Sequence, residues 1–393
     1  NSAVESAIAR ASAEVWATIL EFAIELPESF TDPDTVADNY YRQKWPPSHS
    51  NEESEYWAIE QTKTELRTVC SSWNSLLQGE RYSHRFVSML DVHYGYVPAD
   101  ALKRAERVSF RPAARGTPRE GIASSEGWVS RCMEIIEAVG PIPMRIATEI
   151  PSVALQDFCD TLSSHAPSLV TVTVPRGTSS AFIFPATFES LPNLRHLHSA
   201  PSVLQLNAPP GATVEVANLV ALTIGCGHES LRVNHQRWSF PVLETLRLWS
   251  MDHPEEEARM EGLVTTLRAL GKNVRTLELP TSEMEDMPAE VWSLCPKVER
   301  LFTSHQVRSI PPPNHPIHTI GIPFVREHHI GYDEWTTYPH IPEFPGLRTV
   351  VINNPRAWDM IDEANYLFGY IRDCHSRGVR LEDANGFTYE ERH

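Results

Sequence analysis

One spaced apolar pattern recurs along this chain and limits its fold more than any other feature. In the stretch FPVLETLRLWS, residues 240–250, Leu243, Leu246 and Leu248 stand three and then two residues apart. Seven further stretches fit that spacing, two of them with a hydroxyl residue at the third position: Leu169/Val172/Val174, Leu194/Leu197/Ser199, Leu219/Leu222/Ile224, Val274/Leu277/Leu279, Val298/Leu301/Thr303, Ile317/Ile320/Ile322 and Leu347/Val350/Ile352. We expect each stretch to be a short strand with one buried face.

The intervals between these stretches, and the prolines before them, separate the pattern from chance. Successive first residues lie 19 to 31 positions apart, close to the period of leucine-rich repeats. In five of the eight cases a proline stands two residues before the first apolar position, at Pro167, Pro192, Pro241, Pro296 and Pro345. Only 31 of 393 residues are proline, so this frequency is far above chance. We interpret each proline as a stop signal that ends a helix or loop before a strand.

Helical stretches fill some of the intervals, including 152–164, 255–270 and 287–294. A strand followed by a helix cannot bury its apolar face alone, so neighbouring units must stack. The predicted fold class is therefore α/β: a leucine-rich-repeat solenoid over residues 100–380, with a parallel sheet, helices on its outer side and a C-terminal capping helix within 356–376. The alternative is a globular α/β domain whose even spacing is a coincidence.

Residues 1–80 follow a different pattern. Two helices are expected at 14–24 and 55–77, and each carries an apolar stripe. Between them, at about 27–54, a segment rich in proline and polar residues has the composition of an insert. The segment is too small to bury both stripes internally, so one of them is a candidate interface.

The two stripes resemble a known motif. AEVWATILEFA at 13–23 and ELRTVCSSWNSLL at 65–77 are similar to the F-box, an apolar helix followed by Val-Cys-x-x-Trp, here Val69, Cys70 and Trp73. The Leu-Pro of the usual motif is absent, since residues 11–14 read ASAE. An F-box-like start followed by irregular leucine-rich repeats resembles F-box proteins of fungal type, with an insert inside the box.

This resemblance implies a substrate receptor of a Skp–cullin–F-box ubiquitin ligase. Its partners would be the Skp adaptor, the cullin scaffold and a protein substrate. The adaptor-facing or box-forming residues carried over from the motif are Val15, Trp16, Ile19, Leu20, Leu66, Val69 and Trp73. The alternative is that these residues pack against the first repeats, so that the helices only cap a free-standing leucine-rich interaction protein.

A second candidate surface follows from the alternation of strand side chains. If Leu246 and Leu248 point inward, Arg247 and Trp249 point to the concave side of the sheet. Aromatic side chains beside arginines are typical of binding hot spots. The predicted substrate-binding residues on this side are His196, His198, Arg247, Trp249, Arg300 and Phe302. Alternatively, inserted loops cover these residues, or Trp249 folds over the edge of a repeat.

Charge and composition exclude several other functions. The net charge of -17 argues against binding to nucleic acid or to an anionic membrane surface. No apolar run is long enough for a membrane span, and six scattered cysteines without a CxxC pair favour a cytoplasmic or nuclear protein. The sequence has no phosphate-binding glycine loop, HExxH or GxSxG motif, so we expect a non-catalytic protein without metal or cofactor.

Overall fold

The computed structural model describes the chain in separate stretches. These are residues 12–24, 58–59, 61–63, 65–77, 86–88, 107–110, 134–135, 137–138, 145–148, 169–174, 181–183, 191–199, 204–206, 213–226, 238–250, 256–279, 287–303, 309–322, 344, 346–352, 366–383 and 386–388. The predicted insert at about 27–54 and the predicted helix at 152–164 lie outside these residues.

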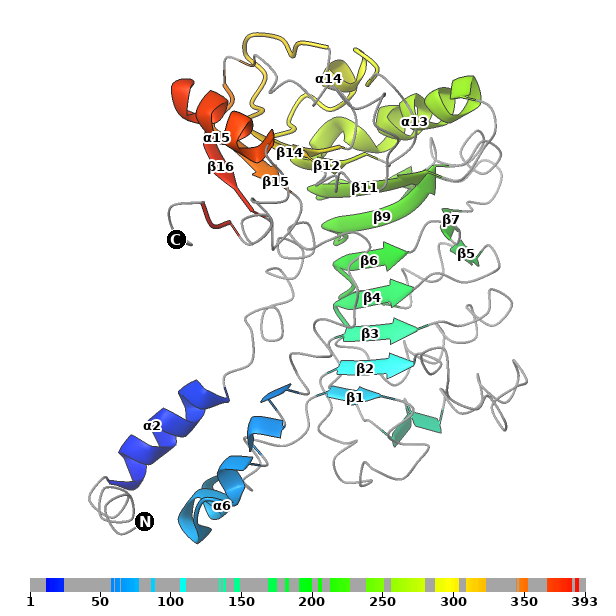
Figure 1. The fold of residues 1–393 in the computed structure, drawn as a ribbon. Coiled ribbons are helices and arrows are strands. Elements are labelled where there is room, and N and C mark those ends of the chain that lie inside the picture. The colour runs from blue at the N-terminus through cyan, green and yellow to red at the C-terminus, as the bar shows by residue number, and fades with distance from the viewer. Residues whose placement is uncertain are drawn as a thin grey trace.

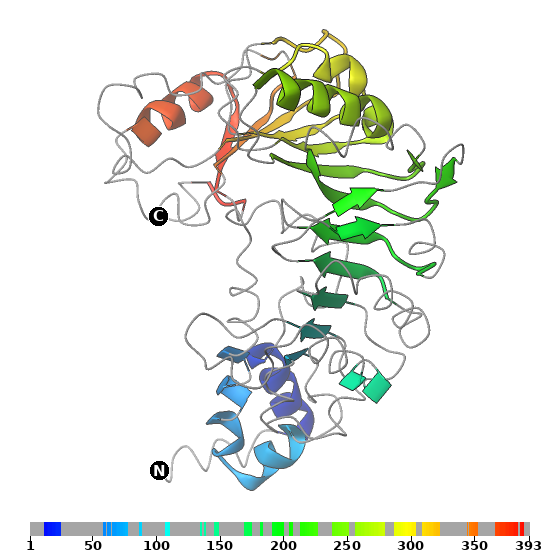
Figure 2. The same cartoon turned by 90° about the vertical axis from the view of Figure 1, so that its right-hand side faces the viewer.

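The fold is α/β, and its main feature is a 12-stranded sheet in which every pairing is parallel and the strands follow one another in chain order. Figures 1 and 2 show these strands stacked one above another. The strands are β1 (Phe86–Ser88), β2 (Arg107–Phe110), β3 (Arg145–Thr148), β4 (Thr171–Val174), β6 (His196–Ser199), β9 (Ala221–Cys226), β11 (Thr245–Ser250), β12 (Thr276–Glu278), β13 (Arg300–Phe302), β14 (Thr319–Ile322), β15 (Thr349–Ile352) and β16 (Arg380–Glu382).

Two smaller parallel pairs lie beside the main sheet. Strand β5 (Ala181–Ile183) pairs with β7 (Leu204–Leu206), and β8 (Val214–Glu215) pairs with β10 (Trp238–Ser239). Parallel strands cannot be joined by tight hairpins, so each pairing requires a connection that crosses back to the start of the next strand. That requirement agrees with the wide intervals between the apolar stretches of the sequence.

The middle apolar residues of the sequence pattern stand in register across the sheet. Leu246 pairs with Leu222 on one side and with Leu277 on the other. The same line continues through the remaining members: Val172, Leu197, Leu301, Ile320 and Val350. All eight are buried. Side chains at alternate positions share one face of a strand, so this line forms the core on one side of the sheet.

The same line extends beyond the repeats found by spacing. Val108 and Ile146 prolong it toward the N-terminus, and Val87 ends it on β1. Leu381 prolongs it at the other end, on β16. Neither Val87 nor Leu381 belongs to the eight apolar stretches.

The recurring prolines occupy one position in a turn. The N–H of Leu194 donates to the carbonyl of Leu191, and the N–H of Leu243 donates to that of Phe240. Each bond closes a four-residue turn whose second residue is a proline, Pro192 or Pro241. Proline is favoured at this position because its ring fixes φ near the value that the turn requires. The proline therefore shapes the turn that leads into the strand. This role is more specific than the one predicted from the sequence, in which proline only ends the preceding helix or loop.

Helices lie along the outer side of the curved sheet (Figure 1). Helix α13 (Glu256–Leu270) coincides with a predicted helix, and the 3-10 turn η4 (Gly271–Asn273) follows it. Leu263 and Leu267 of α13 are completely buried, and the helix contacts β9, β10 and α14 (Val291–Leu294). Helix α14 is shorter than the predicted 287–294, since 287–290 are coil and turn.

The C-terminal helix is followed by a further strand. Helix α15 (Tyr366–Ser376) ends at a turn in which the N–H of Val379 donates to the carbonyl of Cys374 over 2.8 Å. Gly378 has a φ of 65°, a conformation that glycine adopts without strain at a helix end. The chain then enters β16, which α15 contacts. The outermost strand, and not the helix alone, therefore forms this end of the sheet.

Candidate interaction surfaces

The N-terminal helices form a small packed unit at the β1 end of the sheet (Figures 1 and 2). Leu20 of helix α2 (Ala13–Ala23), Ile24 directly after it and Leu77 of helix α6 (Ser71–Leu77) are buried together. Partly buried apolar side chains pack against this cluster: Ile59, Leu66, Trp73 and Leu76. The rings of Trp16 and Trp73 also meet, with centroids 5.0 Å apart. The predicted helix at 55–77 is interrupted at 68–70, where Val69 and Cys70 precede α6.

The seven predicted adaptor-binding residues divide into two groups. Leu20 is buried, and Trp16, Leu66 and Trp73 are half-buried within the helical unit. The other three are large apolar side chains open to solvent: Val15 at 48%, Ile19 at 46% and Val69 at 48%. Val15 and Ile19 are one turn apart and so share a face of α2.

This division bears on the two interpretations of the N-terminal segment. The packing that the structure describes around Leu20 and Trp73 comes from within residues 12–77, so these helices build a core of their own. The exposed side chains Val15, Ile19 and Val69 are not needed for that core. They are the residues of the motif whose side chains are open to a partner.

The predicted substrate-binding residues lie on strands, as expected, but three of them are not open to solvent. His196 and Arg247 are completely buried, and Phe302 is 6% exposed. The expectation of an exposed patch at these three positions is therefore wrong. Strand alternation placed them correctly, since Arg247 and Phe302 stand next to the core residues Leu246 and Leu301. The open face was an assumption, and the sheet is buried on both sides at β11 and β12.

The other three members differ. Arg300 is half-buried on β13. His198 and Trp249 lie on β6 and β11, but their side chains are outside the described residues. None of these six residues is paired in register with another of the six. Arg247 and Phe302 are linked only through Glu278, which is paired with Arg247 on one side and with Phe302 on the other.

Arg247 and Glu278 form a buried ion pair across β11 and β12. Arg247 Nε lies 2.7 Å from Glu278 Oε2, and the two side chains are 0% and 7% exposed. Burial raises the pKa of the Glu278 carboxyl, and Arg247 opposes this shift only in part. Burying two charged side chains costs desolvation energy. The attraction between Arg247 and Glu278 offsets this cost only while the two groups keep their close contact.

Beyond Glu278 the same face becomes apolar. Phe302 is paired in register with Gly321, and Gly321 with Val351. Phe302 and Val351 form a buried cluster, and a Cβ at Gly321 would overlap the Phe302 ring. The absence of a side chain at Gly321 thus makes room for Phe302.

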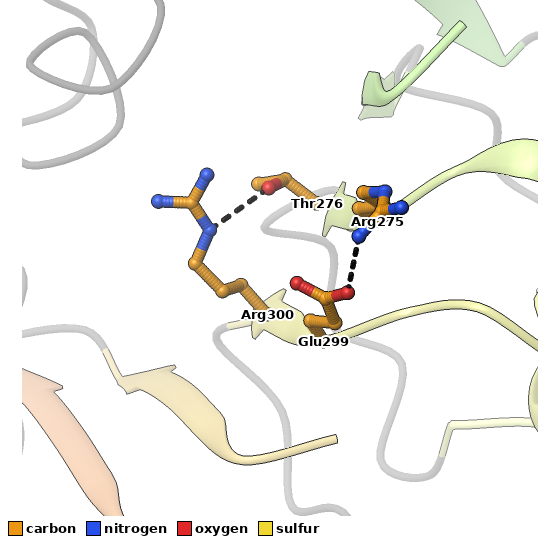
Figure 3. A network of polar contacts seen from close by, with 4 residues as sticks. All are labelled: Arg275, Thr276, Glu299 and Arg300. Carbon is orange, nitrogen blue, oxygen red and sulfur yellow. Dashed lines mark hydrogen bonds and ion pairs between the residues drawn. The ribbon is translucent and has the colours of Figure 1, made fainter. Parts of the chain in front are cut away.

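Polar contacts link successive strands near their N-terminal ends (Figure 3). Arg275 Nη1 lies 2.6 Å from Glu299 Oε1, and these side chains are 53% and 35% exposed. Arg300 Nε donates to Thr276 Oγ1 over 3.0 Å. Figure 3 shows the Arg300 side chain extending away from the Arg275–Glu299 pair, so Arg300 faces a different part of the surface.

Sequence reasoning missed the neighbours of Arg300 on this side of the sheet. Thr319, Thr349 and Arg380 occupy the register positions that follow it. Thr319 and Thr349 belong to the repeats that spacing identified, and the alternation applied to Arg300 would have placed them beside it. Arg380 was harder to find, because Leu381 is the one apolar residue of β16 and Val379 directly precedes the strand.

The metal-capable side chains and the thiols of the described residues can be assessed separately. No three of their His, Cys, Asp or Glu side chains are grouped as a metal ion would require. Burial raises the pKa of Cys295 to about 12, and the pKa of Cys374 is also about 12, through burial and then the nearby Asp373. Both thiols are therefore poor nucleophiles at neutral pH.

Comparison with known proteins gives no independent assignment. No family model matches the chain, and no curated protein sequence matches it. Among the helices that the structure describes, none is long and apolar enough to cross a membrane.

Proposed function

We propose that this chain is a non-catalytic receptor of the F-box type, which holds a protein substrate within a ubiquitin ligase. The observation that carries the proposal is the exposure of Val15, Ile19 and Val69 on a helical unit with its own core. Val15 and Ile19 lie on α2 and Val69 lies in the turn before α6. Large apolar side chains that a fold leaves open are found at protein interfaces. All three stand at positions matched to the box motif.

The finer form of the fold is part of the same proposal: a leucine-rich-repeat solenoid. Chain-order stacking of parallel strands, with one apolar position in register throughout, supports it. Contacts between neighbouring units add to this support. Asn218 Nδ2 donates to the carbonyl of Pro192, and Asn273 Nδ2 donates to that of Pro241, both over 2.9 Å. Each amide joins the turn of one unit to the proline turn of an earlier unit, as in an array whose members contact their neighbours.

In the proposed assembly, the N-terminal helices dock on the Skp adaptor, which connects the chain to the cullin scaffold. The repeat sheet then presents a substrate for ubiquitin transfer by the partner enzymes. In this proposal the chain itself supplies binding and no chemistry. Such a receptor would work in the cytoplasm or nucleus.

Co-expression with the Skp adaptor tests the proposal. We expect a one-to-one complex by light scattering after size exclusion. Val15→Asp combined with Val69→Asp should abolish the complex without unfolding the chain, because both side chains are exposed. Trp16 is a poor choice for this test, since its contact with Trp73 means that its loss also disturbs the helical unit.

The matched control is Val242→Asp, which places the same charge on an equally exposed apolar position before β11. The control should co-purify like the wild type. A well-folded chain that does not co-purify with the adaptor would contradict the receptor role. The N-terminal helices would then be the cap of a free-standing interaction protein.

A further inference from the structure

The connection between β13 and β14 is rich in proline and exposes apolar side chains. Residues 309–317 read SIPPPNHPI, with four prolines in nine positions. Ile310 is 70% exposed, more than any other large apolar side chain of the described residues. Pro312 and Pro313 are exposed as well, whereas Pro311 is buried. This connection therefore carries apolar surface that the core does not use.

The prolines determine the backbone conformation at the start of this connection. A residue that precedes proline is kept out of the α-helical region and adopts an extended or polyproline II conformation. Ile310, Pro311 and Pro312 each precede a proline, and they lie in neither a helix nor a strand. They therefore form one turn of a polyproline II helix, which has three residues per turn. The buried Pro311 faces the protein, so Ile310 and Pro312 point outward from the other two sides.

Helix α14 holds this turn at both ends. Trp292 Nε1 donates to the carbonyl of Ser309 over 3.1 Å, directly before the turn. After the turn, His315 Nε2 lies 3.1 Å from the carbonyl of Cys295, and the N–H of Ile317 donates to His315 Nδ1. The rings of Trp292 and His315 also meet, with centroids 5.1 Å apart. A segment that is fixed in this way loses little conformational entropy when a partner binds it.

The polyproline II conformation ends after one turn. The N–H of His315 donates to the carbonyl of Pro312 over 2.9 Å, which closes a tight turn through Pro313 and Asn314. A groove that requires a long extended segment would therefore not fit here. A single aromatic clamp, which holds one turn of polyproline II, matches the length that is offered.

The chemistry of the turn also limits the kind of partner. Proline has no backbone N–H, so Pro311, Pro312 and Pro313 cannot form a ladder with an added strand. Exposed proline rings and an isoleucine side chain pack instead against flat aromatic side chains, as in known recognition of polyproline II. Residues 304–318 contain no Asp or Glu in a chain with a net charge of -17. The expected contact is therefore apolar.

We propose that residues 309–313, held open by α14, dock into a second protein through a groove lined by aromatic side chains, of the kind found in WW domains. This surface goes beyond the receptor function, which does not use it. Helix α14 lies at the opposite end of the sheet from α2 and α6 (Figures 1 and 2). Docking there leaves the exposed side chains of the N-terminal helices open to the adaptor.

Calorimetric titration of the full chain with purified WW domains that bind proline-rich peptides tests the proposal. We expect one-to-one binding that changes little with salt, because the contact is apolar. Ile310→Ser combined with Pro312→Ala should weaken binding about tenfold or more, since two apolar contacts are lost. The matched control is Val242→Ser with Pro241→Ala, which changes an exposed apolar side chain and an exposed proline elsewhere. The control should bind like the wild type.

Absence of binding, or equal binding by the Ile310/Pro312 variant, would overturn the proposal. Equal binding by a WW domain whose groove tryptophan is replaced by alanine would also overturn it, because the contact would then lie outside the aromatic groove. Trp292→Phe keeps a ring beside His315 but removes the N–H that holds Ser309. This variant should weaken binding by about threefold or more through lost preorganisation, and unchanged binding would contradict the role of α14.

Discussion

Trp16 and Trp73 stack at a tilt, with ring centroids 5.0 Å apart and an interplanar angle of 53°. One lies on α2 and the other on α6, and the whole predicted insert separates these helices in the sequence. The contact closes the helical unit around Leu20 and Leu77. A long insertion in a connecting segment costs little as long as such contacts hold its ends together.

Trp73→Ala should loosen this unit. The change removes both the ring contact with Trp16 and part of the cover over Leu20, at an expected cost of about 2 kcal/mol for a half-buried aromatic side chain. Hydrogen exchange of the α2 amides measures the effect, and exchange should become faster. Val69→Ala, an exposed truncation in the same segment, should change it little. Unaltered protection of α2 in the Trp73 variant would mean that the helices do not depend on each other.

Removing one member of the Arg247–Glu278 pair should be severely destabilising. Arg247→Leu leaves a buried carboxylate without its counter-charge, with an expected loss of about 3–5 kcal/mol in the free energy of unfolding. Arg247→Leu together with Glu278→Leu removes both charges and should recover most of that loss. Urea denaturation of the three chains gives the comparison. If the double variant is no more stable than the single one, the pair is not the cause of the loss.

Glu278 should also make stability depend on pH. Its pKa in the folded state is raised above the ordinary value of 4.5 by burial. The folded state then keeps a proton that the unfolded state loses, so the contribution is full below pH 4.5 and falls as pH rises through the raised pKa. Glu278→Gln should remove this slope from urea midpoints measured across the acid-to-neutral range. The exposed Glu290→Gln should preserve it, and an identical slope in the wild type and in Glu278→Gln would contradict the assignment.

Gly321→Ala tests the packing of Phe302. The new methyl group would overlap Cδ1 of the ring, so the strand or the ring must shift, at an expected cost of about 1–3 kcal/mol. Phe302→Leu in the same chain should relieve the overlap. Gly369→Ala is the control, because nothing lies within 4 Å of its Cβ position on α15, and alanine should stabilise that helix by up to about 1 kcal/mol. Thermal unfolding of the four chains measures these differences, and a tolerated Gly321→Ala would mean that Phe302 does not occupy this space.

The sequence predicted the α/β class and most of the sheet. Spacing alone identified Leu222, Leu246, Leu277 and their counterparts, because apolar side chains at register positions must recur at the same place in each strand. The eight stretches did not include β1, β2, β3 or β16. At β16, Leu381 within the strand and Val379 just before it are two residues apart, without the wider first interval of the pattern. Short strands at the ends of a sheet have fewer neighbours to pack against, so fewer apolar positions mark them.

The candidate surfaces were harder to predict, since exposure depends on the rest of the chain. Alternation placed Arg247 and Phe302 on the correct face but gave no information about what covers that face. The apolar stripes of α2 and α6 were recognised, whereas the division between packing residues such as Leu20 and exposed ones such as Ile19 needed the helix contacts. The sequence pattern shows which residues share a face of a helix or strand. The neighbouring elements determine whether that face is exposed to solvent.

The most direct test of the receptor role is calorimetric titration of the full chain with the purified Skp adaptor. The account predicts one-to-one binding that weakens by about a hundredfold or more when Val15, Ile19 and Val69 are changed to serine together, since exposed apolar anchors at the centre of an interface carry most of its binding energy. Val242→Ser, the exposed control, should bind like the wild type. Absence of binding by a folded wild-type chain, or unchanged affinity in the triple variant, would contradict the central claim.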